Sequence, residues 1–293
     1  MRVPSWIRAH VAALRAVLVL TVLTGVAYPL LVTGLVQLPG LRDQASGSVL
    51  SQHGRAVGSS LIGQSFTDAH GRPLVQYFQS RPSAGGYDPT ATGASNLGPE
   101  SVVDTLRNPA DEHDTGTPSL LTQVCARSLA VGRLEHVDSS RPYCTSTGVG
   151  AVLGVFRTHG DRGAVTRVVS LNQQCPAAPF LTRYHGVRVA CARYGADYSH
   201  AVVTPVRGDA PTHPAVPPDA VTASGSGLDP QISTAYAELQ APRIARERHL
   251  APATVRALID RYTTGRALGF MGEPAVDVVE LNHALDAKYP YRQ

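Results

Sequence analysis

The sequence has almost no lysine. Lys288 is the only lysine among 26 basic residues, and all the others are arginines. A Walker A loop needs Gly-Lys-Ser/Thr, a class A β-lactamase needs Ser-x-x-Lys, and a Schiff-base enzyme needs a buried lysine. Lys288 stands between Ala287 and Tyr289 and matches none of these patterns. These three enzyme classes are therefore excluded.

Charge is also scarce. Charged residues make up 16% of the chain, well below the roughly 25% of an ordinary soluble domain, so part of the chain is expected to lie away from water. The net charge is +4, but the basic residues are scattered and form no run that could follow a nucleic acid backbone. Nucleic acid is therefore not an expected partner.

One long apolar stretch is present near the N-terminus. Residues 16–41 contain no charged side chain and end after Pro39-Gly40. Because about 20 helical residues cross a bilayer, residues 16–38 are predicted to form a single transmembrane helix. The alternative is a cleaved signal peptide, whose apolar region is about 7 to 15 residues and is followed by a small-residue site. The only such cluster here, residues 45–48, lies beyond the Pro-Gly break.

The charges on either side of this segment predict its direction. Arg2, Arg8 and Arg15 precede it without an acidic residue, whereas Arg42-Asp43 follows it. Because positive charge is retained on the cytoplasmic side, residues 1–15 are predicted to be a cytoplasmic arm. The bulk of the chain is then extracytoplasmic, in a single-pass protein of the cell membrane.

Small residues recur within the predicted span. Thr21, Gly25, Pro29 and Thr33 are spaced by four residues and share one stripe of a helix. Such a stripe allows a second helix to approach closely, which makes it a candidate packing surface. The alternative is that Gly and Pro are simply more frequent in membrane helices.

The four cysteines all lie in the middle of the predicted outer portion. An even number on the oxidising side of a membrane favours disulfides. Three pairings are possible; because Val187, Val189 and Cys191 share a strand face, Cys175 is expected to pair with Cys191 and, by elimination, Cys125 with Cys144. Zinc is the alternative, but there is no Cys-x-x-Cys and the histidines are dispersed, so no metal site is predicted.

The rest of the chain predicts an α+β domain. A helix is expected at 119–134, and a hairpin is expected from 149–157 and 164–171, with residues 159–163 as its turn. Further predictions are short strands at 61–66 and 75–78, a loop at 206–218, helix starts near Pro230 and Pro242, and helices at 254–262 and 280–287.

One glycine-rich loop could carry chemistry. Ser224, Gly225, Ser226, Gly227 and Asp229 precede a helix expected to begin near Gln231, and backbone N–H groups at such a place suit an anion. The alternative is a turn with Asp229 or Ser233 as the helix cap. A second cluster, residues 148–154, misses the dinucleotide fingerprint because its third glycine comes too late. No catalytic residue is predicted.

Taken together, the motifs of the chain resemble the KdpC family, the small single-span subunits of bacterial Kdp potassium-transporting P-type ATPases. The resemblance lies in two blocks. The first contains Tyr28-Pro29-Leu30-Leu31, Gly58-Ser59-Ser60-Leu61-Ile62-Gly63-Gln64-Ser65-Phe66, Tyr77-Phe78-Gln79-Ser80-Arg81-Pro82-Ser83, Tyr87-Asp88-Pro89 and Ser95-Asn96-Leu97. The second contains Val221-Thr222-Ala223-Ser224, Gly227-Leu228-Asp229, Pro242-Arg243-Ile244-Ala245, Gly272-Glu273-Pro274-Ala275-Val276 and Val279-Glu280-Leu281-Asn282.

The resemblance predicts the domain organisation. Residues 39–97 and 221–293 are expected to form the KdpC-like domain. Residues 98–220, which include every cysteine, are expected to be an inserted, disulfide-braced subdomain with a Pro-rich linker. Short family members join the two blocks by a few tens of residues only.

The resemblance also implies a function. Family members are accessory subunits that join a channel-like potassium-translocating subunit, an ATP-hydrolysing P-type subunit and a small single-span subunit. They stabilise the assembly and act as catalytic chaperones that raise nucleotide affinity in the ATPase subunit. In the family, the stretch that corresponds to residues 225–229 has been compared with the signature motif of ABC ATPases, in support of direct ATP contact. The predicted orientation opposes such contact, because an outer domain meets no cytosolic ATP, and it favours a cap over the outer potassium entrance.

Two other functions remain open from the residues alone. The chain could be a membrane-anchored extracytoplasmic hydrolase with a triad among its serines and histidines, or a free-standing anchored binding module. ATP and potassium are expected to be handled by the complex, with no cofactor bound directly by this chain.

Overall fold

The computed structural model describes residues 4–52 and 54–291. The chain divides into two compact units, one up to residue 61 and one from residue 62. Most of the first unit is a helix. Its elements are α1 (Ser5–Val22), the π-helical turn η1 (Leu23–Ala27), α2 (Tyr28–Leu35), α3 (Arg42–Ala45), β1 (Val49–Gln52) and β2 (Arg55–Ser59). The two strands form an antiparallel hairpin.

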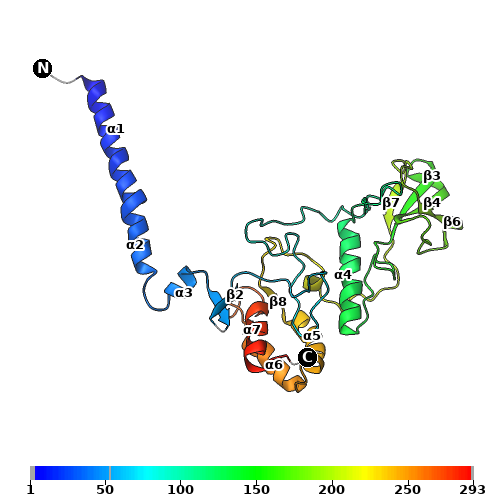
Figure 1. Ribbon diagram of the computed structural model, residues 1–293. Helices are drawn as coiled ribbons and strands as arrows, with labels where there is room; N and C mark the ends of the chain where they lie inside the picture. The colour runs from blue at the N-terminus through cyan, green and yellow to red at the C-terminus, as the bar shows by residue number, and fades with distance from the viewer. Residues whose placement is uncertain (1–3, 53, 292–293) are drawn as a thin grey trace. The chain divides into compact units, whose positions relative to one another are not determined.

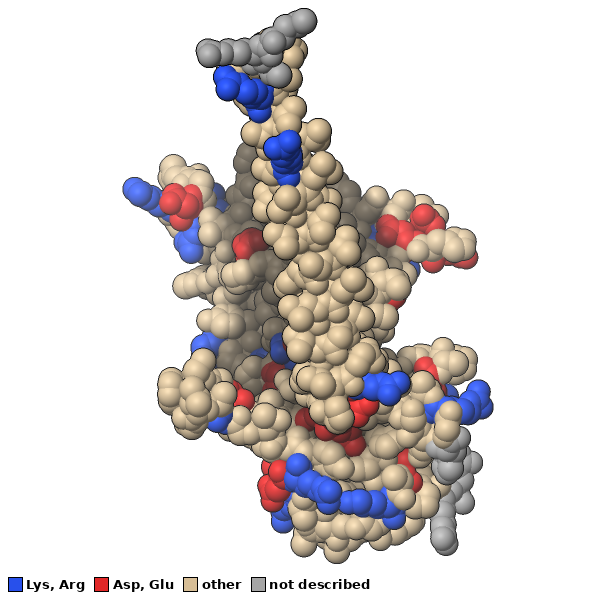
Figure 2. Space-filling model, turned by 90° about the vertical axis from the view of Figure 1, so that its left-hand side faces the viewer, with Lys and Arg blue, Asp and Glu red and all other residues tan. Residues whose placement is uncertain are grey.

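The apolar stretch forms one continuous helix, Ser5–Leu35, whose 31 residues and composition are sufficient to cross a membrane. None of its side chains is buried. Figure 2 shows its surface free of charged side chains over most of its length, with basic side chains towards its N-terminal end. The helix begins at Ser5, within the segment predicted to be an arm, and residues 1–3 with Arg2 lie outside the described residues.

Pro29 explains the π-helical turn in this helix. Proline has no N–H, so the carbonyl four residues earlier, that of Gly25, loses its α-helical partner. In the turn before it, the Tyr28 N–H donates to the Leu23 carbonyl rather than to the Thr24 carbonyl, which is the wider spacing of a π turn. Such local adjustments allow a proline to remain within a membrane helix.

The second unit is α+β, as predicted. Its helices are α4 (Leu120–Glu135), the 3-10 turn η2 (Pro218–Ala220), α5 (Thr234–Glu247), α6 (Pro252–Arg261) and α7 (Val278–Lys288). Its strands are β3 (Val152–His159), β4 (Arg162–Gln174), β5 (Arg183–Tyr184), β6 (Val187–Ala192), β7 (Val202–Pro205), β8 (Gln231–Ser233), β9 (Thr263–Thr264) and β10 (Ala275–Asp277). In Figure 1, α4 lies between the large sheet and the C-terminal helices.

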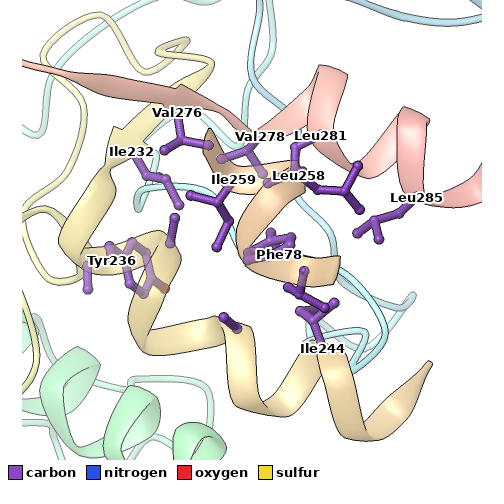
Figure 3. Packing of buried hydrophobic residues seen from close by; sticks show 14 of the residues in the cluster. Phe78, Ile232, Tyr236, Ile244, Leu258, Ile259, Val276, Val278, Leu281 and Leu285 are labelled. Carbon is purple, nitrogen blue, oxygen red and sulfur yellow. The ribbon is translucent and has the colours of Figure 1, made fainter. Parts of the chain in front are cut away.

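The main core of this unit is built by α5, α6 and α7 around Phe78. The Phe78 side chain is fully buried and lies among Ile244, Ile259 and Leu285 (Figure 3). The apolar side chains of each helix recur at helical spacing, which predicted α6 and α7 correctly. The small sheet β8–β10–β9 contributes Ile232 and Val276 to the same core.

The prediction of a strand at residues 75–78 was wrong. Residues 75–77 form a turn, in which Tyr77 N donates to the Leu74 carbonyl at 3.1 Å. Directly after this turn, side-chain amides take the place of a neighbouring strand. Asn282 accepts a hydrogen bond from Phe78 N and donates one to Phe78 O, both at 2.9 Å. Gln240 accepts from Gln79 N at 2.6 Å and donates to Gln79 O at 3.1 Å. These two amide pairs satisfy buried backbone groups that a strand would otherwise have to satisfy.

The second sheet is five-stranded, with the order β5–β6–β4–β3–β7. β3 and β4 form the predicted antiparallel hairpin, while β4 and β6 pair in parallel. Both faces of the sheet are apolar, because Val152 and Val169 belong to one buried cluster and Leu153 and Val168 to another. The sheet therefore has its own small core beside the main one.

Three further sequence predictions were corrected. Residues 61–66 form only one isolated bridge position and no strand. Pro242 lies inside α5, because the buried face of that helix outweighs the cost of a missing hydrogen bond. The helix expected near Gln231 begins at Thr234, after the short strand β8, and Ser233 is its cap. The predicted helix at 119–134 and loop at 206–218 are confirmed.

A buried ion pair attaches α4 to α5. Arg243 Nε lies 3.0 Å from Glu135 Oε1, and the two side chains are 2% and 1% exposed. Arg243 also donates to the Val75 and Tyr77 carbonyls. Burial raises the pKa of Glu135, although the Arg243 charge opposes that shift. The pair thus joins the helix before the large sheet to the C-terminal core.

Candidate functional site

The membrane-type helix contains the predicted packing stripe Thr21, Gly25, Pro29 and Thr33. All four residues are exposed, and a Cβ atom added at Gly25 would approach only Thr21, at 4.0 Å. The π turn lies within this stripe and widens the helix between its members. The exposed stripe can therefore receive another helix at close range, and its role stays a prediction.

The Gly/Ser loop is a compact turn held by its own serines. Ser224 is 1% exposed, and its Oγ accepts hydrogen bonds from Gly227 N at 2.9 Å and Asp229 N at 3.3 Å. Ser226 Oγ accepts from Leu228 N at 3.1 Å. Three of the backbone N–H groups that could have met an anion are thus already used within the loop. Gly225 is exposed, with open space around it.

A second segment of the chain holds this loop in place. Ser83 Oγ donates to Gly227 O at 2.7 Å, and Gly63 N donates to Leu228 O at 2.8 Å. A side chain at Gly63 would collide with the Tyr87 ring and with the Asp229 carbonyl, both closer than 3.0 Å to an added Cβ. Glycine is therefore required at position 63 for the two segments to approach.

The charge beside the loop is mixed. Arg81 Nη1 lies 3.1 Å from Asp229 Oδ2, so the carboxylate of the loop already has a cationic partner. The Tyr87 hydroxyl donates to the Arg81 carbonyl at 2.6 Å, and burial raises the pKa of Tyr87 to about 12. Tyr87 is therefore a neutral structural group at any ordinary pH. The five predicted nucleotide residues are brought together here, but the loop follows β7 and η2 and precedes a strand rather than a helix.

Both predicted disulfides are present. Cys125 bonds with Cys144, and Cys175 bonds with Cys191. The first joins the middle of α4 to the segment before β3, and the second joins the end of β4 to β6. The pairing that followed from strand alternation and elimination is confirmed. Among residues 4–52 and 54–291, no cluster of three or more His, Cys, Asp or Glu side chains could hold a metal ion.

The structure also has an exposed apolar tip at residues 268–271, which the sequence patterns did not predict. Leu268, Phe270 and Met271 are 82%, 71% and 53% exposed. Ala267 and Met271 exchange backbone hydrogen bonds, and Leu268 has a positive φ of 53°, so the tip is a tight turn. Large side chains held in water at such a turn are typical of a contact surface. The sequence pattern that could have indicated this turn is three glycines, at positions 265, 269 and 272, that flank and interrupt a short apolar run.

These features define a class: a protein with one membrane-type helix and an α+β domain that carries an exposed apolar tip. A family model described as "KdpC: K+-transporting ATPase, c chain" matches residues 10–115 and 195–287. More than half of the chain is covered by this match. The chain therefore belongs to the KdpC family.

Individual relatives agree with this assignment. A "Potassium-transporting ATPase KdpC subunit" from Streptomyces avermitilis is 36% identical over 281 residues, which cover 94% of this chain and 91% of the relative. The protein of the same description from Mycobacterium tuberculosis is 33% identical over 281 residues, 95% and 98% of the two chains. A third, from Janthinobacterium, is 34% identical over 274 residues, which cover 92% of this chain and 93% of the relative.

The family model leaves out residues 116–194, which hold α4, most of the large sheet and both disulfides. The relatives above are aligned over at least 92% of this chain, so their alignments run through this middle segment. The segment is therefore shared by full-length relatives, although the family model does not contain it.

Proposed function

We propose that this chain is a non-catalytic subunit of an ATP-driven potassium uptake complex, which it stabilises from the outer side of the membrane. The observation that most strongly supports this proposal is the family match in two blocks, the first of which covers most of the apolar helix. Catalysis is assigned to another subunit of the complex. ATP and potassium are handled by the complex, and no cofactor is assigned to this chain.

The proposed orientation rests on charge and on the disulfides. Arg8 and Arg15 precede the uncharged stretch, and the positive-inside rule then favours a cytoplasmic N-terminus. Both disulfides lie after the span, and disulfides persist in oxidising compartments outside the cytoplasm. An outer domain of this kind is suited to cap the outer potassium entrance. Residues 98–220 would be an inserted subdomain of that outer domain.

The proposed partners are a channel-like potassium-translocating subunit, an ATP-hydrolysing P-type subunit and a small single-span subunit. Two surfaces support contact with them. The stripe containing Gly25 suits a neighbouring membrane helix, and the apolar tip at 268–271 suits a protein surface outside the bilayer. We assign the helix contact and the tip contact to subunits of the same complex.

As a catalytic chaperone, this chain is proposed to affect nucleotide binding by the ATPase subunit indirectly, through contacts within the complex. The Ser224 and Ser226 hydroxyl oxygens accept hydrogen bonds from backbone N–H groups of the loop, and the Asp229 carboxylate adds a negative charge beside them. A triphosphate would have to displace these bonds and approach a carboxylate. This argument supports an indirect effect over direct ATP contact at residues 224–229.

Deletion and complementation test the proposal. A strain without this chain should lose growth at micromolar potassium and regain it when the chain is supplied, and the pump subunits should co-purify with the chain in mild detergent. A Phe270→Ser variant at the tip should reduce co-purification, whereas Tyr194→Ser, which is 48% exposed elsewhere, should not. A chain that runs as a monomer and leaves potassium uptake unchanged when deleted would contradict the proposal and favour a free-standing binding module.

A further inference from the structure

Three arginines lie side by side on one face of the five-stranded sheet. Arg183 on β5 is paired directly with Arg188 on β6. Arg167 on β4 and Arg188 each come one residue before the parallel pair Val168 and Val189, so they are neighbours on adjacent strands. Paired residues of neighbouring strands point to the same face of a sheet. The three arginines therefore form a line across three strands, which we call the arginine row.

The arginine row has no negative partner in the part of the chain that the structure describes. Its three side chains are exposed, and none of them forms an ion pair with a described residue. Of the nearby carboxylates, Asp161 pairs with Arg162 at 3.7 Å and Asp197 accepts a hydrogen bond from Ser199 N at 2.8 Å. Because like charges on paired strands repel one another, the row favours an anion above it.

Both ends of the arginine row are oriented by the chain itself. Arg167 Cζ lies 4.8 Å from the centre of the Phe156 ring and 5.5 Å from that of the Tyr198 ring. Both rings pack against a buried cluster of the sheet, and a guanidinium group over such rings is attracted to their faces. At the other end, Arg183 Nη1 donates to the Gly186 carbonyl at 2.7 Å. A partner therefore meets side chains that are already partly ordered.

The spacing of the arginine row indicates the shape of its partner. Neighbouring strands are about 4.8 Å apart, so the row is about 10 Å long. Three carboxylates on one face of an extended strand would cover about 14 Å, because every second residue faces the same side. Carboxylates at positions i, i+3 and i+7 of an α-helix share one face and cover about 10 Å along its axis. The row therefore matches a helix better than an extended strand.

We propose that the arginine row binds an acidic α-helix of a partner protein, with carboxylates at i, i+3 and i+7 that pair with the three guanidinium groups. Arginine suits this contact because its planar group can bind a carboxylate through two hydrogen bonds. The strand β6 lies at the end of the second unit away from α7, where the chain itself leaves it accessible (Figure 1). The row belongs to residues 116–194, which the family model leaves out, so it gives that segment a binding role of its own.

Fluorescence anisotropy with the full chain in neutral detergent tests the proposal. The probe is a labelled helical peptide of alanine and glutamine that carries glutamates at i, i+3 and i+7. A second peptide has the same composition, but its glutamates are spread around the helix. The first peptide should bind and lose affinity as salt is raised, and the second should bind severalfold more weakly. This readout does not depend on potassium uptake, so its failure is distinct from a failure of the proposed function.

The triple variant Arg167→Gln/Arg183→Gln/Arg188→Gln should weaken binding of the first peptide by about tenfold or more, the scale of three exposed ion pairs. The matched control removes the same charge from three exposed arginines elsewhere and should leave the affinity within about twofold. This control is Arg55→Gln/Arg133→Gln/Arg261→Gln.

The single variant Arg188→Gln keeps the test valid if the triple variant does not fold, because it removes one exposed charge and neither aromatic contact. It should weaken binding by about threefold. A folded original chain that binds neither peptide, or both peptides equally, overturns the proposal, and so does an equal loss in the two triple variants. If phosphatidylglycerol added to the micelles displaces the peptide and an uncharged lipid does not, the partner is a lipid surface and the assignment of a protein helix is overturned.

Discussion

The amide pairs of Asn282 and Gln240 show how single side chains decide this fold. Each amide satisfies one buried N–H and one buried carbonyl of the segment around Phe78. Their loss would leave two buried backbone groups without partners, and each such group costs about 1–3 kcal/mol. These residues matter for stability far more than their uncharged character suggests.

Asn282→Ala is therefore expected to lower the free energy of unfolding by about 2–5 kcal/mol, because it unpairs Phe78 N and O together. Urea unfolding followed by circular dichroism measures this change. Lys288→Ala on the exposed side of the same helix is the control and should stay within about 0.5 kcal/mol of the original chain. A loss as small as that of the control would show that water satisfies the Phe78 backbone.

Asp277 gives the stability a pH dependence. It caps α7 by accepting a hydrogen bond from Glu280 N at 2.8 Å, and burial raises its pKa from 3.8 to about 6. The native state then binds the proton more tightly than the unfolded chain does. The stabilisation from protonated Asp277 is complete below about pH 4 and is lost as the pH rises through about 6.

Asp277→Asn keeps a good helix cap and removes this titration. The original chain should lose stability relative to Asp277→Asn as the pH rises from 4 to 7, as measured by urea unfolding at several pH values. The exposed Asp260→Asn on α6 should keep the pH slope of the original chain. If the free energy of unfolding changed with pH equally in the original chain and in Asp277→Asn, the raised pKa of Asp277 would be contradicted.

At the scale of elements, the two disulfides stabilise α4 and the large sheet. They close loops with sequence separations of 19 and 16 residues. In the chain-entropy description, each closure stabilises the folded state by about 3 kcal/mol. The disulfide between Cys175 and Cys191 also ties two strands that pair only in parallel, β4 and β6.

A Cys175→Ser/Cys191→Ser double variant should therefore unfold with a free energy lower by about 3 kcal/mol. Thermal denaturation of the double variant, compared with the original chain before and after reduction, measures this loss. Reduction should also remove the remaining disulfide and lower the stability of the variant further. A double variant as stable as the original chain would show that strand pairing alone holds this part together.

The elements also show what sequence patterns can predict. The helix at α4, the hairpin of β3 and β4 and both disulfides followed from periodicity and alternation, because these features depend on neighbours in the sequence. The strand expected at 75–78 and the helix start at Pro242 failed. Both depend on partners more than a hundred residues away, such as Asn282 or the Glu135–Arg243 pair.

The same limit applies to the candidate sites. The loop at 224–229 was found from its glycines, whose conformations are local. The contact between residues 65–87 and α4 could not be found in this way, because these segments meet only in the folded chain. The apolar tip at 268–271 lay in the sequence but had no periodicity to mark it.

At the scale of the whole molecule, orientation is the property on which the proposed function depends. A reporter fused after Gln293 is expected to be active only outside the cytoplasm, because residues 2–15 carry positive charge and residues 16–41 carry none. Protease added to spheroplasts should degrade the large portion of the chain. The matched control is a fusion placed before Ser5. A reporter active in the cytosol would overturn the outer cap and the proposed route of the nucleotide effect.

The amide pairs also set the order in which this protein can be completed. The segment around Phe78 leaves the ribosome early, but Gln240 and Asn282 follow it by 161 and 204 residues. Until α7 has been synthesised, that segment lacks the partners for its backbone and most of the core that it enters. The core around Phe78 therefore forms only after α7 is present, and a nascent chain that stops before α7 leaves Phe78 exposed to quality-control proteases.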